Sequence, residues 1–129
     1  MRDTRLRPWL VAAAAAVTML TAPSTAPAGE ADVVAVEIVA EGEGRFRFDV
    51  SVRHDDEGWD HYADAWEVLG PDGTVLGTRV LLHPHESEQP FTRSLAGVAI
   101  PETVRTVTVR ARDKVHGLGG REITVAVPR

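Results

Sequence analysis

The segment at residues 45–53, RFRFDVSVR, alternates strictly between apolar and polar side chains. Successive side chains of an extended strand lie on opposite sides, so this period predicts a strand with one buried and one exposed face. No part of the chain after the first 28 residues has a convincing helical period. Six further β-rich segments predict the other strands: 33–40, 62–69, 74–83, 91–100, 104–112 and 121–127.

Seven short strands in about 100 residues, separated by turn signals, predict an all-β fold. We expect a single seven-stranded β-sandwich, with Trp66 as the large core residue between two sheets. The segment LAGVAIPETVRTVTVRARD, at 95–113, resembles part of an immunoglobulin-like or fibronectin-III-like domain, where an apolar strand, a Gly/Pro turn and an alternating strand follow one another. Such folds serve many functions, so this resemblance implies architecture only.

The first 28 residues have the three-part layout of a secretory signal peptide: an arginine-containing start, an apolar run at 9–20 and the small residues APA at 26–28. We expect cleavage after Ala28 and a single domain at 29–129, in the periplasm or secreted. The alternative is a membrane anchor, but the apolar run is short for a bilayer span, which needs about 20 residues. The sequence has no cysteine, so we expect neither a lipid anchor nor a membrane span after cleavage.

Charge and the absence of sulfur narrow the expected partners. The predicted leader contains three arginines and one aspartate, so its removal leaves 11 basic and 18 acidic residues, a net charge of −7. This charge disfavours nucleic acid and anionic lipid and favours cations. Both methionines, Met1 and Met19, lie in the leader. A metal ion would therefore be held by imidazole, carboxylate or backbone oxygen.

All histidines of the sequence fall in three of the expected loops, at 54–61, 83–90 and 113–120. In a sandwich of this connectivity these three loops emerge at the same end. We therefore expect a histidine cluster there, beside several carboxylates. The alternative is that polar loops collect solvated histidines that have no common function. The five residues are His54, His61, His83, His85 and His116.

The sequence HPH at 83–85 would place two imidazoles on the same side of an extended segment, which Pro84 stiffens. Imidazole and carboxylate ligands suit Zn²⁺ and Cu²⁺, so zinc or copper(II) is the predicted cofactor, although the spacing matches no standard zinc motif. The predicted metal ligands are His83, His85, His116 and His61. The residues expected to support them, or to contact a partner, are Asp64, Asp60, Asp113, Arg93 and Trp59.

Two of these supporting residues have alternative interpretations. By alternation Asp64 points inward, where Arg93, His116, a metal ion or backbone amides could be its partner. Trp59 lies in the acidic sequence DDEGWD, which lacks calcium-loop spacing and is more typical of a solvated loop. This tryptophan could contact a partner or fold back as a lid.

Three classes of function remain at this stage. We favour a periplasmic or secreted protein that binds divalent transition metal. The alternative is a non-catalytic module that binds an envelope protein through Trp59, Tyr62 and Phe91. An enzyme is the least favoured, because the serines lack a nucleophile motif and GLGG at 117–120 precedes a strand rather than a helix. Convergence of the imidazole rings would support metal binding, and an exposed Trp59–Phe91 patch would support the interaction module.

The segments WDHYADAWEV, LHPHESEQPFTRSL and HGLGG also resemble a group of small exported bacterial β-sandwich proteins. That resemblance implies an exported domain and carries over no site residues.

Overall fold

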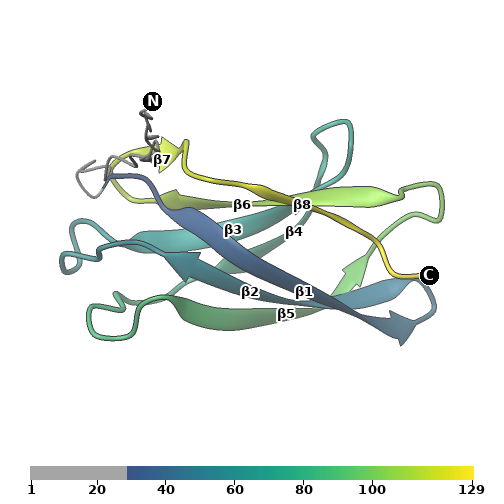
Figure 1. Cartoon of the computed structure of the whole chain (residues 1–129), viewed down its shortest axis with the longest axis horizontal. Helices are drawn as coiled ribbons and strands as arrows, with labels where there is room; N and C mark the ends of the chain where they lie inside the picture. The colour runs from purple at the N-terminus through teal and green to yellow at the C-terminus, as the bar shows by residue number, and fades with distance from the viewer. Residues whose placement is uncertain (1–28) are drawn as a thin grey trace, which may run out of the picture.

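A computed structural model describes residues 29–129, and the predicted signal peptide at 1–28 lies outside the described residues. Two antiparallel sheets form a β-sandwich (Figure 1). One sheet has the order β1-β2-β5, and the other has β4-β3-β6-β7, with β8 also paired to β6. The strands are β1 (Asp32–Gly42), β2 (Arg45–Arg53), β3 (Ala63–Leu69), β4 (Val75–Val80), β5 (Phe91–Ala99), β6 (Thr106–Asp113), β7 (Gly117–Leu118) and β8 (Ile123–Ala126).

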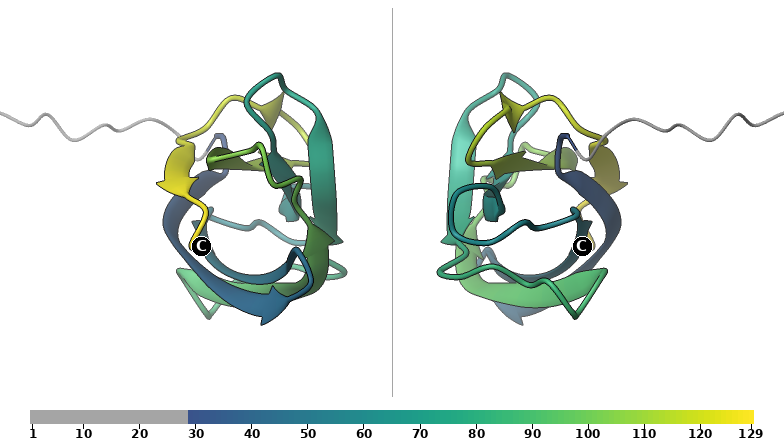
Figure 2. Two further views of the ribbon diagram at one scale, coloured as in Figure 1. Left: turned by 90° about the vertical axis from the view of Figure 1, so that its right-hand side faces the viewer. Right: turned by 90° about the vertical axis from the view of Figure 1, so that its left-hand side faces the viewer.

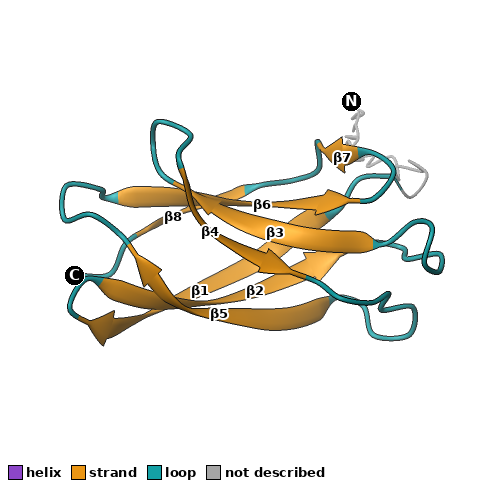
Figure 3. Ribbon diagram, turned by 180° about the vertical axis from the view of Figure 1, so that it is seen from behind, coloured by secondary structure: helices purple, strands orange, loops and turns teal. Residues whose placement is uncertain are grey.

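The predicted all-β sandwich is confirmed: residues 29–129 contain strands, turns and loops and no helix, as Figure 3 shows from behind. The number of strands differs from the expected seven because Gly117–Leu118, in the expected turn, pairs with the end of β6 as a two-residue strand. The immunoglobulin-like or fibronectin-III-like type of the sandwich stays a prediction. Within the described part of the chain, no helix has the length and hydropathy needed to cross a bilayer.

The core lies between the two sheets, and β2 contributes to it as its alternation predicts. Its buried members Phe46, Phe48, Val50 and Val52 are each at most 3% exposed. Trp66 of β3 is completely buried in the same cluster, which confirms its expected core position. Burial of side chains of this size contributes about 1.5–3 kcal/mol each, so an apolar core holds this cysteine-free domain together.

One irregularity in β3 changes the orientation expected for Asp64. The pairing of β3 with β6 shifts register between Ala63 and Ala65, and both of these alanines are buried. A bulge of this kind breaks the strict alternation of faces. The Asp64 carboxylate is therefore partly exposed and forms an ion pair with Arg112, whose Nε lies 3.3 Å from Asp64 Oδ1. The expected inward orientation of Asp64 is therefore wrong, and its ion-pair partner, Arg112, was not among the partners that the sequence suggested.

The three histidine-containing loops lie at one end of the sandwich, as predicted. The loops that follow β2, β4 and β6 lie at the left of Figure 1, together with the first described residues of the chain. The connections that follow β1, β3 and β5 lie at the opposite end, together with the C-terminus. The right-hand view of Figure 2 looks directly onto the histidine-containing end. The fold therefore brings the loops together, and their local conformation decides which imidazoles meet.

Candidate metal centre

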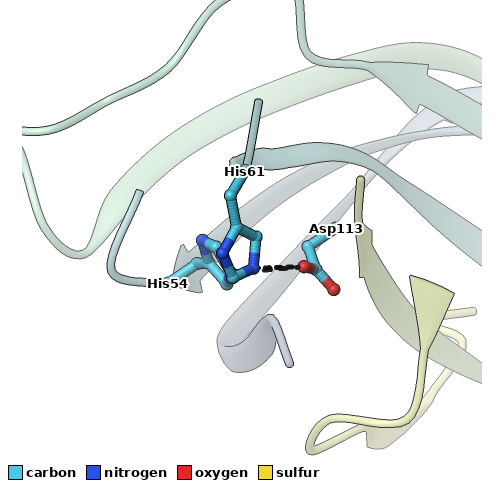
Figure 4. Close-up of side chains that lie close together, drawn as sticks. All are labelled: His54, His61 and Asp113. Atoms are coloured by element: carbon cyan, nitrogen blue, oxygen red, sulfur yellow. Dashed lines mark hydrogen bonds and ion pairs between the residues drawn. The ribbon is translucent and has the colours of Figure 1, made fainter. Parts of the chain in front are cut away.

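Two histidines and one aspartate converge at this end of the sandwich (Figure 4). His54 follows β2, His61 precedes β3, and Asp113 is the last residue of β6. The Nε2 atoms of the two histidines are 3.2 Å apart. Asp113 Oδ2 lies 2.6 Å from His61 Nε2 and 3.6 Å from His54 Nε2. Zinc–nitrogen bonds of about 2.0–2.1 Å place tetrahedral ligands about 3.3 Å apart, so His54 Nε2 has nearly this spacing from the other two atoms. His61 Nε2 and Asp113 Oδ2 lie at a hydrogen-bond distance and would have to separate to bind a shared ion.

A carboxylate fixes the far side of each imidazole ring. Asp56 Oδ1 is 2.6 Å from His54 Nδ1, and Glu57 Oε1 is 3.0 Å from His61 Nδ1. A carboxylate only accepts hydrogen bonds, so each Nδ1 donates a proton. His61 Nε2, which lies 2.6 Å from Asp113 Oδ2, donates a second proton unless a metal ion takes its place. Histidines that bind metal in proteins generally have a hydrogen-bond acceptor at the other ring nitrogen.

The electrostatics of the group favour a cation. Burial raises the pKa of Asp113, but hydrogen bonds from the side chain and backbone of His116, and from His61, hold that pKa below its ordinary value. Asp113 is therefore an ionised carboxylate with no solvent exposure. Burial lowers the pKa of His61, but its hydrogen bonds with Glu57 and Asp113 outweigh burial and raise that pKa. A buried carboxylate requires a compensating positive charge, and either a proton or a metal ion can supply it.

Asp56 joins this group to the loop between β4 and β5. Its buried carboxylate accepts hydrogen bonds from His54 Nδ1, from the backbone N–H of Ala63 at 3.0 Å and from that of His85 at 2.6 Å. Gln89 adds a second connection, because it accepts from the His54 backbone and donates to the His85 carbonyl. The position of the His54 ring therefore depends on two loops that are far apart in sequence.

The structure assembles only part of the predicted ligand set. His61 lies at the centre of the group, and His116 lies beside it, with Nδ1 3.1 Å from Asp113 Oδ2. Asp113, expected in a supporting role, occupies a ligand position. His54 was not among the predicted ligands, yet the sequence contains a signal for it. It continues the alternation of β2 as the next residue on the buried face, and an imidazole at that position is 2% exposed.

His83 and His85 form a separate pair, with ring centroids 4.6 Å apart. β4 ends at Val80 rather than at the HPH sequence, and His83 bonds only its neighbour's carbonyl, that of Pro84, among the described residues. His85 is buried and stacks on Phe91 at a centroid distance of 4.0 Å. Neither nitrogen of the His85 ring has a hydrogen-bond partner within residues 29–129. The described residues that converge are His54, His61 and Asp113, without His83 or His85, so the role of these two histidines as ligands stays a prediction.

The remaining supporting residues also lie outside the group. Arg93 forms an ion pair with Glu88 at 3.3 Å, and Asp60 is exposed on its loop. Trp59 is 63% exposed and contacts Tyr62 edge-on, with ring centroids 5.8 Å apart. Phe91 is 1% exposed, so the expected Trp59–Phe91 surface patch is not formed.

The fold and this group define a β-sandwich with a candidate metal centre at one end. No protein-family model and no solved structure matches the chain. A relative from Halomicrobium mukohataei, named "Putative lipoprotein", is 45% identical over 96 residues. The match covers 74% of this chain and 47% of the relative, so the chain spans about half the length of the relative that it matches.

Proposed function

We propose that this chain is an exported protein that binds zinc or copper(II) through His54, His61 and Asp113. The observation that carries the proposal is the convergence of His54 Nε2, His61 Nε2 and Asp113 Oδ2 within 4.8 Å of one another. Each imidazole is also oriented by a carboxylate at Nδ1, as metal-binding histidines usually are. The His83–His85 pair is not part of this proposed ligand set.

The choice of metal follows from the ligand atoms. Two imidazole nitrogens and one carboxylate oxygen suit Zn²⁺ or Cu²⁺ and do not suit Cu(I), which prefers sulfur. Calcium prefers six to eight oxygen ligands, which this group does not provide. The mostly buried position of the three side chains favours a partly dehydrated ion held for storage, delivery or sensing.

An envelope or exported location is supported by two observations. The sequence begins with a predicted signal peptide, and the relative from Halomicrobium mukohataei carries the name of a lipoprotein class, whose members are exported. The relative is about twice as long as the matched region, so the rest of its length provides no argument for this chain.

The exposed indole of Trp59 favours a second candidate, contact with an envelope protein at the same end of the sandwich. At 63% exposure it is a large apolar side chain open to a partner. Because Phe91 is buried and Tyr62 nearly so, this surface is smaller than the sequence suggested. Metal binding therefore remains the function that the geometry supports best.

The test is elemental analysis of exported protein purified without a histidine tag, combined with thermal melts with and without chelator. We expect about one zinc or copper ion per chain and a melting temperature that falls on chelation, because a ligand of the folded state stabilises it. His61→Ala should remove the metal, since it deletes one of the three ligands, and it should spare the fold, since this side chain is the least buried of the three. His83→Ala, at an exposed imidazole outside the group, is the matched control and should retain it.

Metal-free protein whose melt is unchanged by added Zn²⁺ and Cu²⁺ would overturn the proposal. The His54–His61–Asp113 group would then be a protonated hydrogen-bond cluster. Equal loss of metal from the His61→Ala and His83→Ala variants would also count against this ligand set.

A further inference from the structure

We propose that the new amino terminus of the exported chain, at Gly29, completes the metal centre with its carbonyl oxygen and its free α-amine. This inference rests on the proposed function and adds two ligand atoms to it. It also makes the centre dependent on removal of the leader.

The Gly29 carbonyl oxygen lies 3.1 Å from His54 Nε2. The same nitrogen faces His61 Nε2 at 3.2 Å and Asp113 Oδ2 at 3.6 Å. A ring nitrogen has either one proton or one lone pair, so it can satisfy only one of these three neighbours by a hydrogen bond. A cation in their midst satisfies all of them, because tetrahedral zinc ligands lie about 3.3 Å apart.

Core packing and backbone hydrogen bonds fix the segment that follows Gly29. Ala31 is completely buried in the core. The backbone N–H of Val33 donates to the Arg121 carbonyl at 2.9 Å, and the Arg121 N–H donates to Asp32 Oδ1 at 2.7 Å. Gly120 packs so closely on the Ala31 carbonyl that a Cβ atom would not fit. Gly29 is therefore two residues from a buried, fixed residue, and its carbonyl oxygen lies against His54 Nε2.

Removal of the leader would change the chemistry of the Gly29 nitrogen. Hydrolysis of the Ala28–Gly29 bond by a signal peptidase uses one water molecule, leaves a carboxyl group on Ala28 and frees the amine of Gly29. Before cleavage this nitrogen belongs to an amide, whose delocalised lone pair is a poor metal ligand. After cleavage the amine and the carbonyl oxygen of the same residue can close a five-membered chelate ring. The cell would thus complete the site only in exported protein.

The test moves the amino terminus without changing the domain. Two glutamines are inserted between Ala28 and Gly29, which leaves the APA sequence at 26–28 intact, creates no small-residue cleavage site directly before Gly29 and converts the Gly29 amine into an amide. The control carries two glutamines after Arg129, at the opposite end of the sandwich (Figure 1). All proteins are exported with their own leader, and intact mass establishes the first residue. Cu²⁺ and Zn²⁺ are then titrated against a competing chelator, and the Cu²⁺ forms are compared by electron paramagnetic resonance.

We expect wild type to begin at Gly29, and the amino-terminal insertion to weaken Cu²⁺ binding at least tenfold and remove one nitrogen ligand from the spectrum. The carboxyl-terminal insertion should behave as wild type does. Equal affinity and identical spectra for all three proteins, or a wild-type chain that begins at another residue, would overturn this inference and leave the His54–His61–Asp113 site standing. No metal binding by any of the three would instead refute the proposed function, and this inference with it.

Discussion

The Nε2 atoms of His54 and His61 face each other at 3.2 Å, while the Nδ1 atom of each ring is bonded to a different carboxylate. Two neutral rings held in this way would direct their lone pairs at each other and at a buried aspartate. The arrangement is stable only when a proton or a metal ion lies between them. The fold therefore holds the group in a geometry that suits a cation, and variants of the residues that enforce this geometry test the proposed centre.

Asp56 should be essential for both stability and metal affinity. Asp56→Asn removes a buried charged acceptor from three donors, and each charged hydrogen bond contributes about 1.5–3 kcal/mol. We expect a clearly lower melting temperature and metal affinity reduced about 10–100-fold, the usual effect of removing the partner of a metal-binding histidine. The measurements are a thermal melt of the metal-free protein and a competition titration.

The neighbouring exposed carboxylate provides the control for that experiment. Asp55→Asn makes the same chemical change one residue away at an exposed carboxylate, and it should change neither the melting temperature nor the metal affinity. If the two variants behaved alike, Asp56 would not orient His54 as described.

His85 should make the domain sensitive to acid. Burial, followed by the nearby charges of Arg93 and His83, lowers the pKa of His85. The unfolded chain, with a histidine pKa of about 6.5, then binds the proton more readily than the folded one. Neutral His85 therefore contributes its full stabilisation when the pH is above the unfolded pKa of about 6.5. This stabilisation is lost as the pH falls from the unfolded pKa toward the lower pKa of the folded state.

The His85→Leu variant tests this sensitivity. Leucine can pack on Phe91 without two unpartnered ring nitrogens, so the variant should lose less melting temperature between pH 8 and pH 5 than wild type. Melts of both metal-free proteins across this range provide the comparison. An identical fall in melting temperature in the two proteins would mean that protonation of His85 does not destabilise the fold.

Gly120 should be required for the position of the amino-terminal segment. A Cβ atom at this residue would collide with the Ala31 carbonyl, so Gly120→Ala must displace one of the two segments. We expect destabilisation by about 1–3 kcal/mol, the usual range for overpacking, together with weaker metal binding. Gly70→Ala is the control, because its Cβ would meet nothing closer than 3.4 Å. A Gly120→Ala variant as stable as that control would mean that the amino-terminal segment is not fixed there.

Alternation along the strands allowed the sandwich and the common end of its loops to be predicted from sequence. The same alternation in β2 continues to His54, so the burial of this proposed ligand could have been predicted from the sequence. The orientation of Asp64 was not, because the bulge at Ala63–Ala65 depends on pairing with β6. The separation of His83 and His85 from the His54–His61–Asp113 group could not be predicted from the sequence. It depends on the stacking of His85 on Phe91 and on the hydrogen bond from the His85 backbone to Asp56.

The most direct test of the central claim is anomalous diffraction from crystals of the exported protein grown with Zn²⁺ or Cu²⁺, measured on both sides of the metal absorption edge. The proposed centre should give one strong peak about 2 Å from His54 Nε2, His61 Nε2 and Asp113 Oδ2. Crystals without a peak there, or with metal only at His83 and His85, would contradict it.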